Sequence, residues 1–154
     1  MDASAFGIGF ILKEKWLAWR FTAAHPLLPR GPDGKIIMSW AELIAVEMGI
    51  RTVISAGFRD VAVTVHSDNQ GVVMALKSGK WTKKYGLEET VKDILGLCRG
   101  AGLSLTMKWI RTTDNPADDP SRGFYPPAES SFEYRPVIPP KMYGLVQDVG
   151  QGTS

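Results

Sequence analysis

The sequence contains very little cysteine. Cys98 is the single thiol among 154 residues, so the chain cannot form a disulfide within itself. Structural disulfides are typical of oxidising compartments. We therefore expect a reduced intracellular setting, such as the cytoplasm or the nucleus.

Long apolar runs and a signal peptide are also missing. A membrane-spanning helix needs about 20 predominantly apolar residues, and the nearly continuous apolar run at residues 3–12 is much shorter and contains two glycines. We therefore expect no membrane partner. Strand-like sequence follows directly after Asp2, and we interpret the chain as a segment of a longer polypeptide.

Neither sign of charge is in large excess. Eighteen Lys and Arg against 16 Asp and Glu give a formal net charge of +2, which is too small to indicate a charged partner by itself. The length suits one domain of ordinary size with a real core. The positions of the charged residues are therefore more informative than their number.

Hydrophobic periodicity predicts five strands and four helices. The expected strands are residues 3–12, 16–22, 36–38, 61–65 and 103–109, and the helices begin near residues 39, 69, 87 and 115. The first two strands form a hairpin around a polar turn at 13–15. The run at 61–65 (VAVTV) is typical of a strand buried on both faces.

This order of elements predicts an α/β domain over residues 1–123. A three-stranded antiparallel meander precedes two parallel crossover strands, which gives a mixed five-stranded sheet with helices on both faces. Residues 124–154 include five prolines between positions 126 and 140. We expect this Pro-rich tail to be an extended arm or linker outside the core.

Four acidic residues fall at corresponding edges of the predicted sheet. Asp2 leads the first strand, and Asp68 follows the strand at 61–65. Glu42 and Asp118 lie near the starts of two helices. Carboxylates brought together repel one another and raise their own pKa values unless cations neutralise them. Such oxygen ligands suit Mg²⁺ or Mn²⁺. Two of these ions can stabilise the attacking oxygen and the leaving oxygen in the hydrolysis of a phosphodiester.

These residues also have ordinary structural interpretations. Asp68 or Asn69 can cap the following helix, and Glu42 can complete an S-x-x-E capping box with Ser39. The acidic residue of the last helix can interact with the helix dipole. Glu47 is a rival to Glu42, but five residues of helix rotate by about 500°, so the two side chains point about 140° apart.

Four motifs occur in order along the chain. They are Asp2-Ala3-Ser4 with Gly7-Ile8-Gly9, then Trp40-Ala41-Glu42-Leu43, then Ser67-Asp68-Asn69, and finally Asn115-Pro116-Ala117-Asp118-Asp119-Pro120-Ser121-Arg122-Gly123. Together they resemble the ribonuclease H domain of retrotransposon reverse transcriptase polyproteins, the fungal ones in particular, and of hepatitis B-type viral polymerases. The last motif is the most specific, and the resemblance covers about residues 2–123.

The resemblance implies a ribonuclease H-like fold and an endonuclease that hydrolyses the RNA strand of RNA·DNA hybrids during reverse transcription. By motif, the catalytic metal ligands fall on Asp2, Glu42, Asp68 and Asp118, which would hold two Mg²⁺ ions, with Mn²⁺ as a substitute. The implied partners are the RNA·DNA hybrid and the polymerase domain of the same polyprotein, and the implied setting includes a virus-like particle as well as the cytoplasm. Ser4 and Asn69, each close to a ligand in sequence, are candidates for substrate contact.

One position departs from the pattern of cellular members. They carry a histidine in the loop before the last acidic residue, where it is thought to help the product leave. Here residues 111–114 read RTTD. Viral-type relatives also lack this histidine, so we expect slow turnover rather than loss of activity.

A basic segment lies between the second and third predicted helices. Its residues are Lys77, Lys80, Trp81, Lys83, Lys84 and Tyr85. A lysine-rich loop is most often solvated surface, but aromatic residues between the lysines favour binding to a nucleic-acid backbone with base stacking.

Two other functions remain open from the sequence. The domain can be a DNA-directed nuclease on the same fold, or a non-catalytic module that binds nucleic acid within a larger polyprotein. The presence of all four carboxylates argues against the non-catalytic module.

Overall fold

The computed structural model describes residues 1–22 and 25–149. Short 3-10 helices occur at Lys84–Gly86, Thr112–Asp114, Ala128–Ser130 and Pro140–Met142. The strands and α-helices, in chain order, are β1 (Asp2–Ala3), β2 (Gly7–Leu12), β3 (Lys15–Phe21), α1 (Met38–Ser55), β4 (Ala62–Ser67), α2 (Gln70–Ser78), α3 (Leu87–Ala101), β5 (Ser104–Trp109), α4 (Asp118–Ser121) and β6 (Val146–Asp148).

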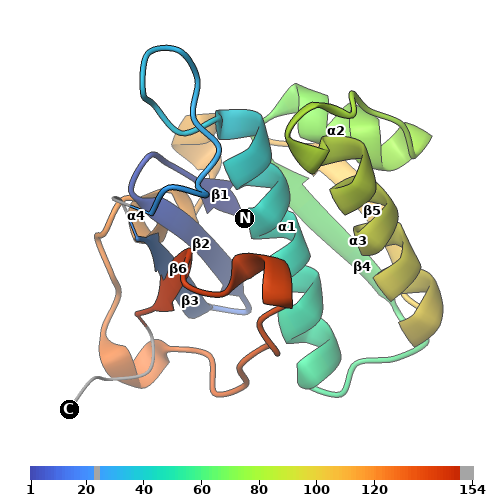
Figure 1. The fold of residues 1–154 in the computed structure, drawn as a ribbon. Coiled ribbons are helices and arrows are strands. Elements are labelled where there is room, and N and C mark those ends of the chain that lie inside the picture. Colours follow the sequence, from blue (N-terminus) through green and yellow to red (C-terminus); the bar gives the residue numbers. More distant parts are fainter. Residues whose placement is uncertain (23–24, 150–154) are drawn as a thin grey trace.

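An antiparallel sheet with the strand order β1-β2-β3-β6 forms one part of the fold (Figure 1). The predicted hairpin is confirmed, since β2 pairs with β3 from Gly7–Arg20 to Leu12–Lys15. Its turn residues Lys13 and Glu14 both have positive φ, as tight two-residue hairpin turns require. The apolar run at 3–12 is not one strand, because a turn at residues 4–6 folds β1 back onto β2.

A separate parallel pair, β4 and β5, forms the second sheet, with α3 in the crossover between them. The protein is therefore mixed α/β, but the prediction of one five-stranded mixed sheet is wrong. Only Asp2 and Ala3 of β1 pair with β2, so no strand joins β2 to β4 along their length within the described residues. The predicted strand at 36–38 is also wrong: Ile36 makes a single bridge to Arg30, and Met38 already begins α1.

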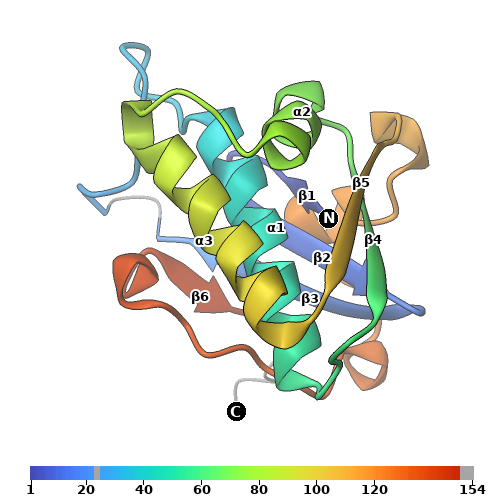
Figure 2. The same cartoon turned by 90° about the vertical axis from the view of Figure 1, so that its right-hand side faces the viewer.

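Helices cover both faces of the antiparallel sheet, as neighbouring residues of β2 show. A Cβ atom at Gly9 would lie 2.7 Å from the Ala117 carbonyl oxygen, so glycine allows α4 to pack directly on that face. The next residue, Phe10, points to the opposite face and contacts α1 at Gly49, because strand side chains alternate. α1 is buried on nearly all sides between this sheet and α3 (Figure 2).

The Pro-rich tail packs against the domain, which corrects the expectation that it lies outside the core. β6 pairs with β3, and Met142 and Leu145 are buried in the hydrophobic core. Lys141 Nζ donates a hydrogen bond to Glu47 Oε1 of α1 at 2.6 Å. Residues 150–154 of the predicted arm lie outside the described residues, and the domain boundary at residue 123 stays a prediction.

No helix in the described ranges 1–22 and 25–149 combines the length and the apolar character needed to cross a bilayer.

Two methionine substitutions test whether the tail belongs to the core. Met142 is 1% exposed and Met74 of α2 is 63% exposed. Met142→Ala should lower the free energy of unfolding by about 2–4 kcal/mol, because it leaves a cavity, whereas Met74→Ala should change it by less than about 0.5 kcal/mol. Urea denaturation measures both, and equal effects would mean that the tail does not contribute to the core.

Candidate metal centre

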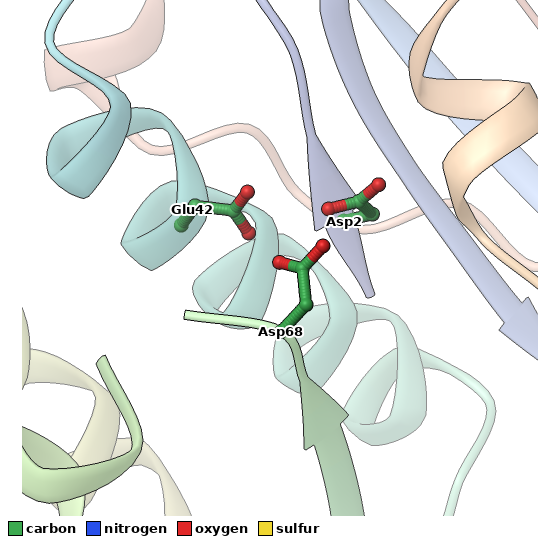
Figure 3. Close-up of side chains that lie close together, drawn as sticks. All are labelled: Asp2, Glu42 and Asp68. Atoms are coloured by element: carbon green, nitrogen blue, oxygen red, sulfur yellow. The ribbon is translucent and has the colours of Figure 1, made fainter. Parts of the chain in front are cut away.

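Three of the four predicted carboxylates converge in the structure. Asp2, Glu42 and Asp68 each offer an oxygen atom, and these oxygens lie within 4.8 Å of one another. Figure 3 shows the three side chains pointing toward one another from β1, from α1 and from the end of β4. Asp2 is 1% exposed and Glu42 is 6% exposed, whereas Asp68 is half-buried, so two of the three carboxylates are shielded from water.

The strand-to-helix turn after β4 positions Asp68. Asn69 is the N-cap of α2, and its side-chain oxygen accepts a hydrogen bond from the Val72 backbone N–H at 3.1 Å. The backbone N–H of Asn69 itself donates to Ser67 Oγ. The capping interpretation is thus confirmed for Asn69, which leaves the Asp68 side chain to face the other carboxylates. A substrate contact by Asn69 stays a prediction.

Glu42 has no capping role. α1 begins at Met38 after the N-cap Ile37, no side chain caps it, and its first turn contains no acidic residue. The capping box with Ser39 is therefore wrong. Glu42 lies beyond the first turn of α1, where its carboxylate is buried.

Glu47 faces away from the cluster, as the helical rotation predicted. Its carboxylate is paired with Arg51 Nε at 2.9 Å and with Lys141 Nζ at 2.6 Å. Glu47 thus has two cationic partners on its own side of α1. The rival assignment of a metal ligand to Glu47 has no geometric support.

Burial dominates the electrostatics of the two innermost carboxylates. Burial first, and then the charges of Asp2 and Asp68, raise the pKa of Glu42 to about 9. Burial, a side-chain hydrogen bond with Asp118 and the charge of Asp68 raise the pKa of Asp2 to about 7. Both groups therefore tend to hold protons near neutral pH unless a cation replaces them.

Asp118 lies beside Asp2 but outside the group of three converging oxygens. Partial burial opposes its charged form, yet the side-chain hydrogen bond with Asp2 and the ion pair with Arg122 outweigh it and keep the pKa of Asp118 below its usual range. Arg122 Nε donates to Asp118 Oδ1 at 3.0 Å. From the sequence, Asp119 either faces solvent or pairs with Arg122 at i+3; Asp119 is exposed, and the pairing is wrong because Arg122 pairs with Asp118.

The four-residue spacing of Ala117 and Ser121 predicts that both residues pack the last helix down, and this packing is confirmed. Ala117 and Ser121 are both fully buried and hold α4 against the sheet. Ser4 lies at this contact: its Oγ donates to the Ser121 carbonyl oxygen at 2.6 Å and accepts from the backbone N–H groups of Phe6 and Gly7. These bonds give Ser4 a structural role, and its contact with substrate stays a prediction.

Sequence reasoning missed the groups that hold Asp68. Thr112 Oγ1 donates to Asp68 Oδ2 at 2.9 Å, and Trp109 Nε1 donates to the Asp68 carbonyl oxygen at 3.1 Å. Thr112 belongs to the segment 111–114, which contains no histidine. These partners are more than 40 residues away from Asp68 in sequence, so no local pattern could reveal them, whereas the i,i+4 spacing of Asp118 and Arg122 could have indicated their pairing.

The basic segment lies at the end of α2 and in the following loop. Lys77 is in the last turn of α2, not in the loop as predicted. Lys80, Lys83 and Lys84 lie at the surface. Trp81 is half-buried and packs against the core, so only part of its ring surface remains for stacking.

Comparisons of the chain with protein-family models, with curated protein sequences and with solved structures found no match. The interpretation of the site therefore depends on its own geometry and on the four sequence motifs.

The raised pKa values predict how pH affects stability in EDTA. The folded chain keeps protons on Asp2 and Glu42 that the unfolded chain releases near pH 4, so stability should fall as pH rises from about 5 to 8.

Asp68→Asn removes one repelling charge. This variant should be at least as stable as the wild type at pH 8, and the difference should shrink at pH 5. Thermal melts at the two pH values measure this difference in stability, and Asp119→Asn, at an exposed residue, is the control. A variant less stable than the wild type at both pH values would contradict the repulsion.

Proposed function

We propose that the chain is a ribonuclease H-like domain that hydrolyses the RNA strand of RNA·DNA hybrids with two Mg²⁺ ions, or with Mn²⁺ as a substitute. The observation that carries the proposal is the convergence of Asp2, Glu42 and Asp68 within 4.8 Å. These are the residues that three of the four motifs assign as ligands. They come from three separate elements, so chance proximity along the chain does not explain their meeting.

The donor set fits hard divalent cations. It consists of carboxylate oxygens, which Mg²⁺ and Mn²⁺ prefer, and burial makes the negative charges costly without a counterion. Asp2, Glu42 and Asp68 would bind the first ion, and Asp118, next to Asp2, would complete the second position. Bound there, the ions would activate the attacking water and stabilise the leaving 3′ oxygen.

The remaining residues of the site orient these ligands. Thr112 and Trp109 fix Asp68 through its side chain and its backbone, respectively. Arg122 holds Asp118 from the outside, with its side chain 53% exposed. A guanidinium at this rim can also contact a phosphate of the bound strand.

The substrate would be recognised by the shape of the hybrid and by its 2′-hydroxyl groups, independent of base sequence. The surface lysines at positions 80, 83 and 84 are suited to the phosphate backbone. The polymerase domain of the same polyprotein is the proposed neighbour, since an RNA·DNA hybrid is the product of reverse transcription.

A substrate panel tests the proposal. A labelled RNA·DNA hybrid, an RNA duplex, a DNA duplex and single strands are incubated with Mg²⁺ or Mn²⁺, with Asp68→Asn as the inactive control. We expect cleavage of the RNA strand in the hybrid alone. Cleavage of DNA would favour the DNA-directed nuclease instead. Binding of the hybrid without any cleavage by the wild type would favour the non-catalytic module.

Asp118 and Asp119 should differ sharply in this assay. Asp118 contacts Asp2, whereas Asp119, rotated by about 100° on the helix, is exposed. Asp118→Asn should lower Mg²⁺-dependent cleavage by at least about 100-fold, an effect of about 2.7 kcal/mol, and Asp119→Asn should retain most of it. Initial rates at saturating hybrid measure both. The opposite ranking would mean that the motif is assigned one residue out of register.

The basic segment should affect binding more than chemistry. Replacing Lys80, Lys83 and Lys84 with Ala should weaken hybrid binding. The slope of log affinity against log salt concentration should become shallower by about 0.7–0.9 for each phosphate that the variant no longer neutralises. The rate at saturating substrate should change little. Affinity measured across a salt series tests this, with Lys15 and Lys35, exposed lysines elsewhere, replaced by Ala as the control. An unchanged salt slope in the triple variant would make the segment ordinary surface.

A further inference from the structure

The connection between β5 and α4 leads from one proposed ligand to another. It begins beside Asp68, where the Ile110 backbone N–H donates to the Ser67 carbonyl oxygen at 3.0 Å and continues the parallel pairing with β4. It ends at Asp118, the first residue of α4. The path of this connection therefore affects how the carboxylates face one another.

Side-chain hydrogen bonds anchor the connection at both ends. At its start, Trp109 Nε1 donates to the Asp68 carbonyl oxygen at 3.1 Å. Towards its end, Asn115 is 5% exposed, and its Nδ2 donates to the carbonyl oxygen of Met1 at 2.8 Å. Since Met1 immediately precedes β1, the connection is tied both to β1 and to the end of β4.

Thr112 lies between these two anchors, in an ordered turn. It begins the 3-10 helix Thr112–Asp114, and its carbonyl oxygen accepts a hydrogen bond from the Asn115 backbone N–H at 3.2 Å. The residue is exposed, yet its hydroxyl has a fixed partner, because Oγ1 donates to Asp68 Oδ2 at 2.9 Å. The turn therefore presents the hydroxyl to the Asp68 carboxylate.

This hydrogen bond makes the two carboxylate oxygens of Asp68 unequal. Oδ2 is engaged by Thr112, whereas Oδ1 accepts no hydrogen bond from any residue in the ranges 1–22 and 25–149. Figure 3 shows the carboxylate directed toward those of Asp2 and Glu42. A donor held on one oxygen also restrains rotation of the carboxylate, so Asp68 is arranged to give one oxygen to a cation.

The number of oxygens that a carboxylate gives distinguishes Mg²⁺ from Ca²⁺. Mg²⁺ requires nearly ideal octahedral geometry with ligands at about 2.0–2.1 Å. Ca²⁺ takes about six to eight oxygens at about 2.3–2.6 Å, and both oxygens of one carboxylate can bind it. A carboxylate restrained to one oxygen therefore favours Mg²⁺, and one that can turn and give both oxygens is better suited to Ca²⁺.

We propose that Thr112 is a positioning residue that sets the cation selectivity of the site, because it restrains Asp68 to the one-oxygen mode that suits Mg²⁺ and disfavours Ca²⁺. The inference rests on the proposed function for the metal site itself, and it adds a role for a residue that is not a ligand. A purely structural role for Thr112 would instead affect the affinities of both cations equally.

Cation binding without substrate tests the proposal. Electron paramagnetic resonance measures free Mn²⁺, and competition with Mg²⁺ or Ca²⁺ then gives the affinity of each cation. Thr112→Val removes the hydroxyl but keeps the branched shape. It should lower the Mg²⁺ affinity by about tenfold or more, the size typical of substitutions that remove a hydrogen bond to a ligand. The ratio of Mg²⁺ to Ca²⁺ affinity should fall by at least about threefold.

Two further variants at the same position separate the hydroxyl from the rest of the side chain. Thr112→Ser keeps the hydroxyl and should keep a ratio within about twofold of the wild type, whereas Thr112→Ala should lower the ratio as Thr112→Val does. The matched control is Thr113→Val, at the neighbouring exposed threonine, whose side chain makes no hydrogen bond within the described part of the chain. It should leave both affinities unchanged. Thermal melts in EDTA verify that each variant is folded.

Equal losses of Mg²⁺ and Ca²⁺ affinity in Thr112→Val would overturn the proposal and leave Thr112 a structural residue of the turn. A change in the ratio for Thr112→Ser as large as that for Thr112→Val would overturn it as well. A wild-type chain that binds none of the three cations would contradict the proposed function itself, and the inference with it. That outcome is recognised before any variant is compared.

Discussion

Mutual repulsion between buried carboxylates is the constraint around which the site is built. Asp2, Glu42 and Asp68 face one another within 4.8 Å, and burial together with the neighbouring charges raises the pKa values of the first two. A fold that brings like charges together in this way loses stability unless protons or cations neutralise them. The neighbouring groups of Thr112 and Trp109 hold Asp68 in position rather than neutralise it, which is consistent with a site prepared for a divalent cation.

β1 links this site to the parallel pair β4 and β5. Asp2 contributes a carboxylate to the cluster, while Met1 reaches β4 through the His66 carbonyl oxygen. The strand has only two residues, so few backbone bonds hold the most buried of the three carboxylates in place.

Local patterns predicted what is local in this fold. The hairpin at Lys13 and Glu14, the cap at Asn69 and the packing of Ala117 and Ser121 were all predicted from neighbouring residues. The positions of Asp2, Glu42 and Asp68 followed from motifs. Distant contacts were not predicted. The division into two sheets depends on how few residues of β1 pair, and the burial of Met142 depends on β6 meeting β3 from the far end of the chain.

Anomalous scattering from crystals soaked in Mn²⁺ would test the central claim most directly, because it locates the cation itself. We predict a manganese peak within about 2.0–2.3 Å of carboxylate oxygens of Asp2, Glu42 and Asp68, and no such peak in Asp68→Asn crystals soaked in the same way. Manganese bound only elsewhere, or a wild-type cluster that stays protonated without a peak in saturating Mn²⁺ at pH 8, would contradict it.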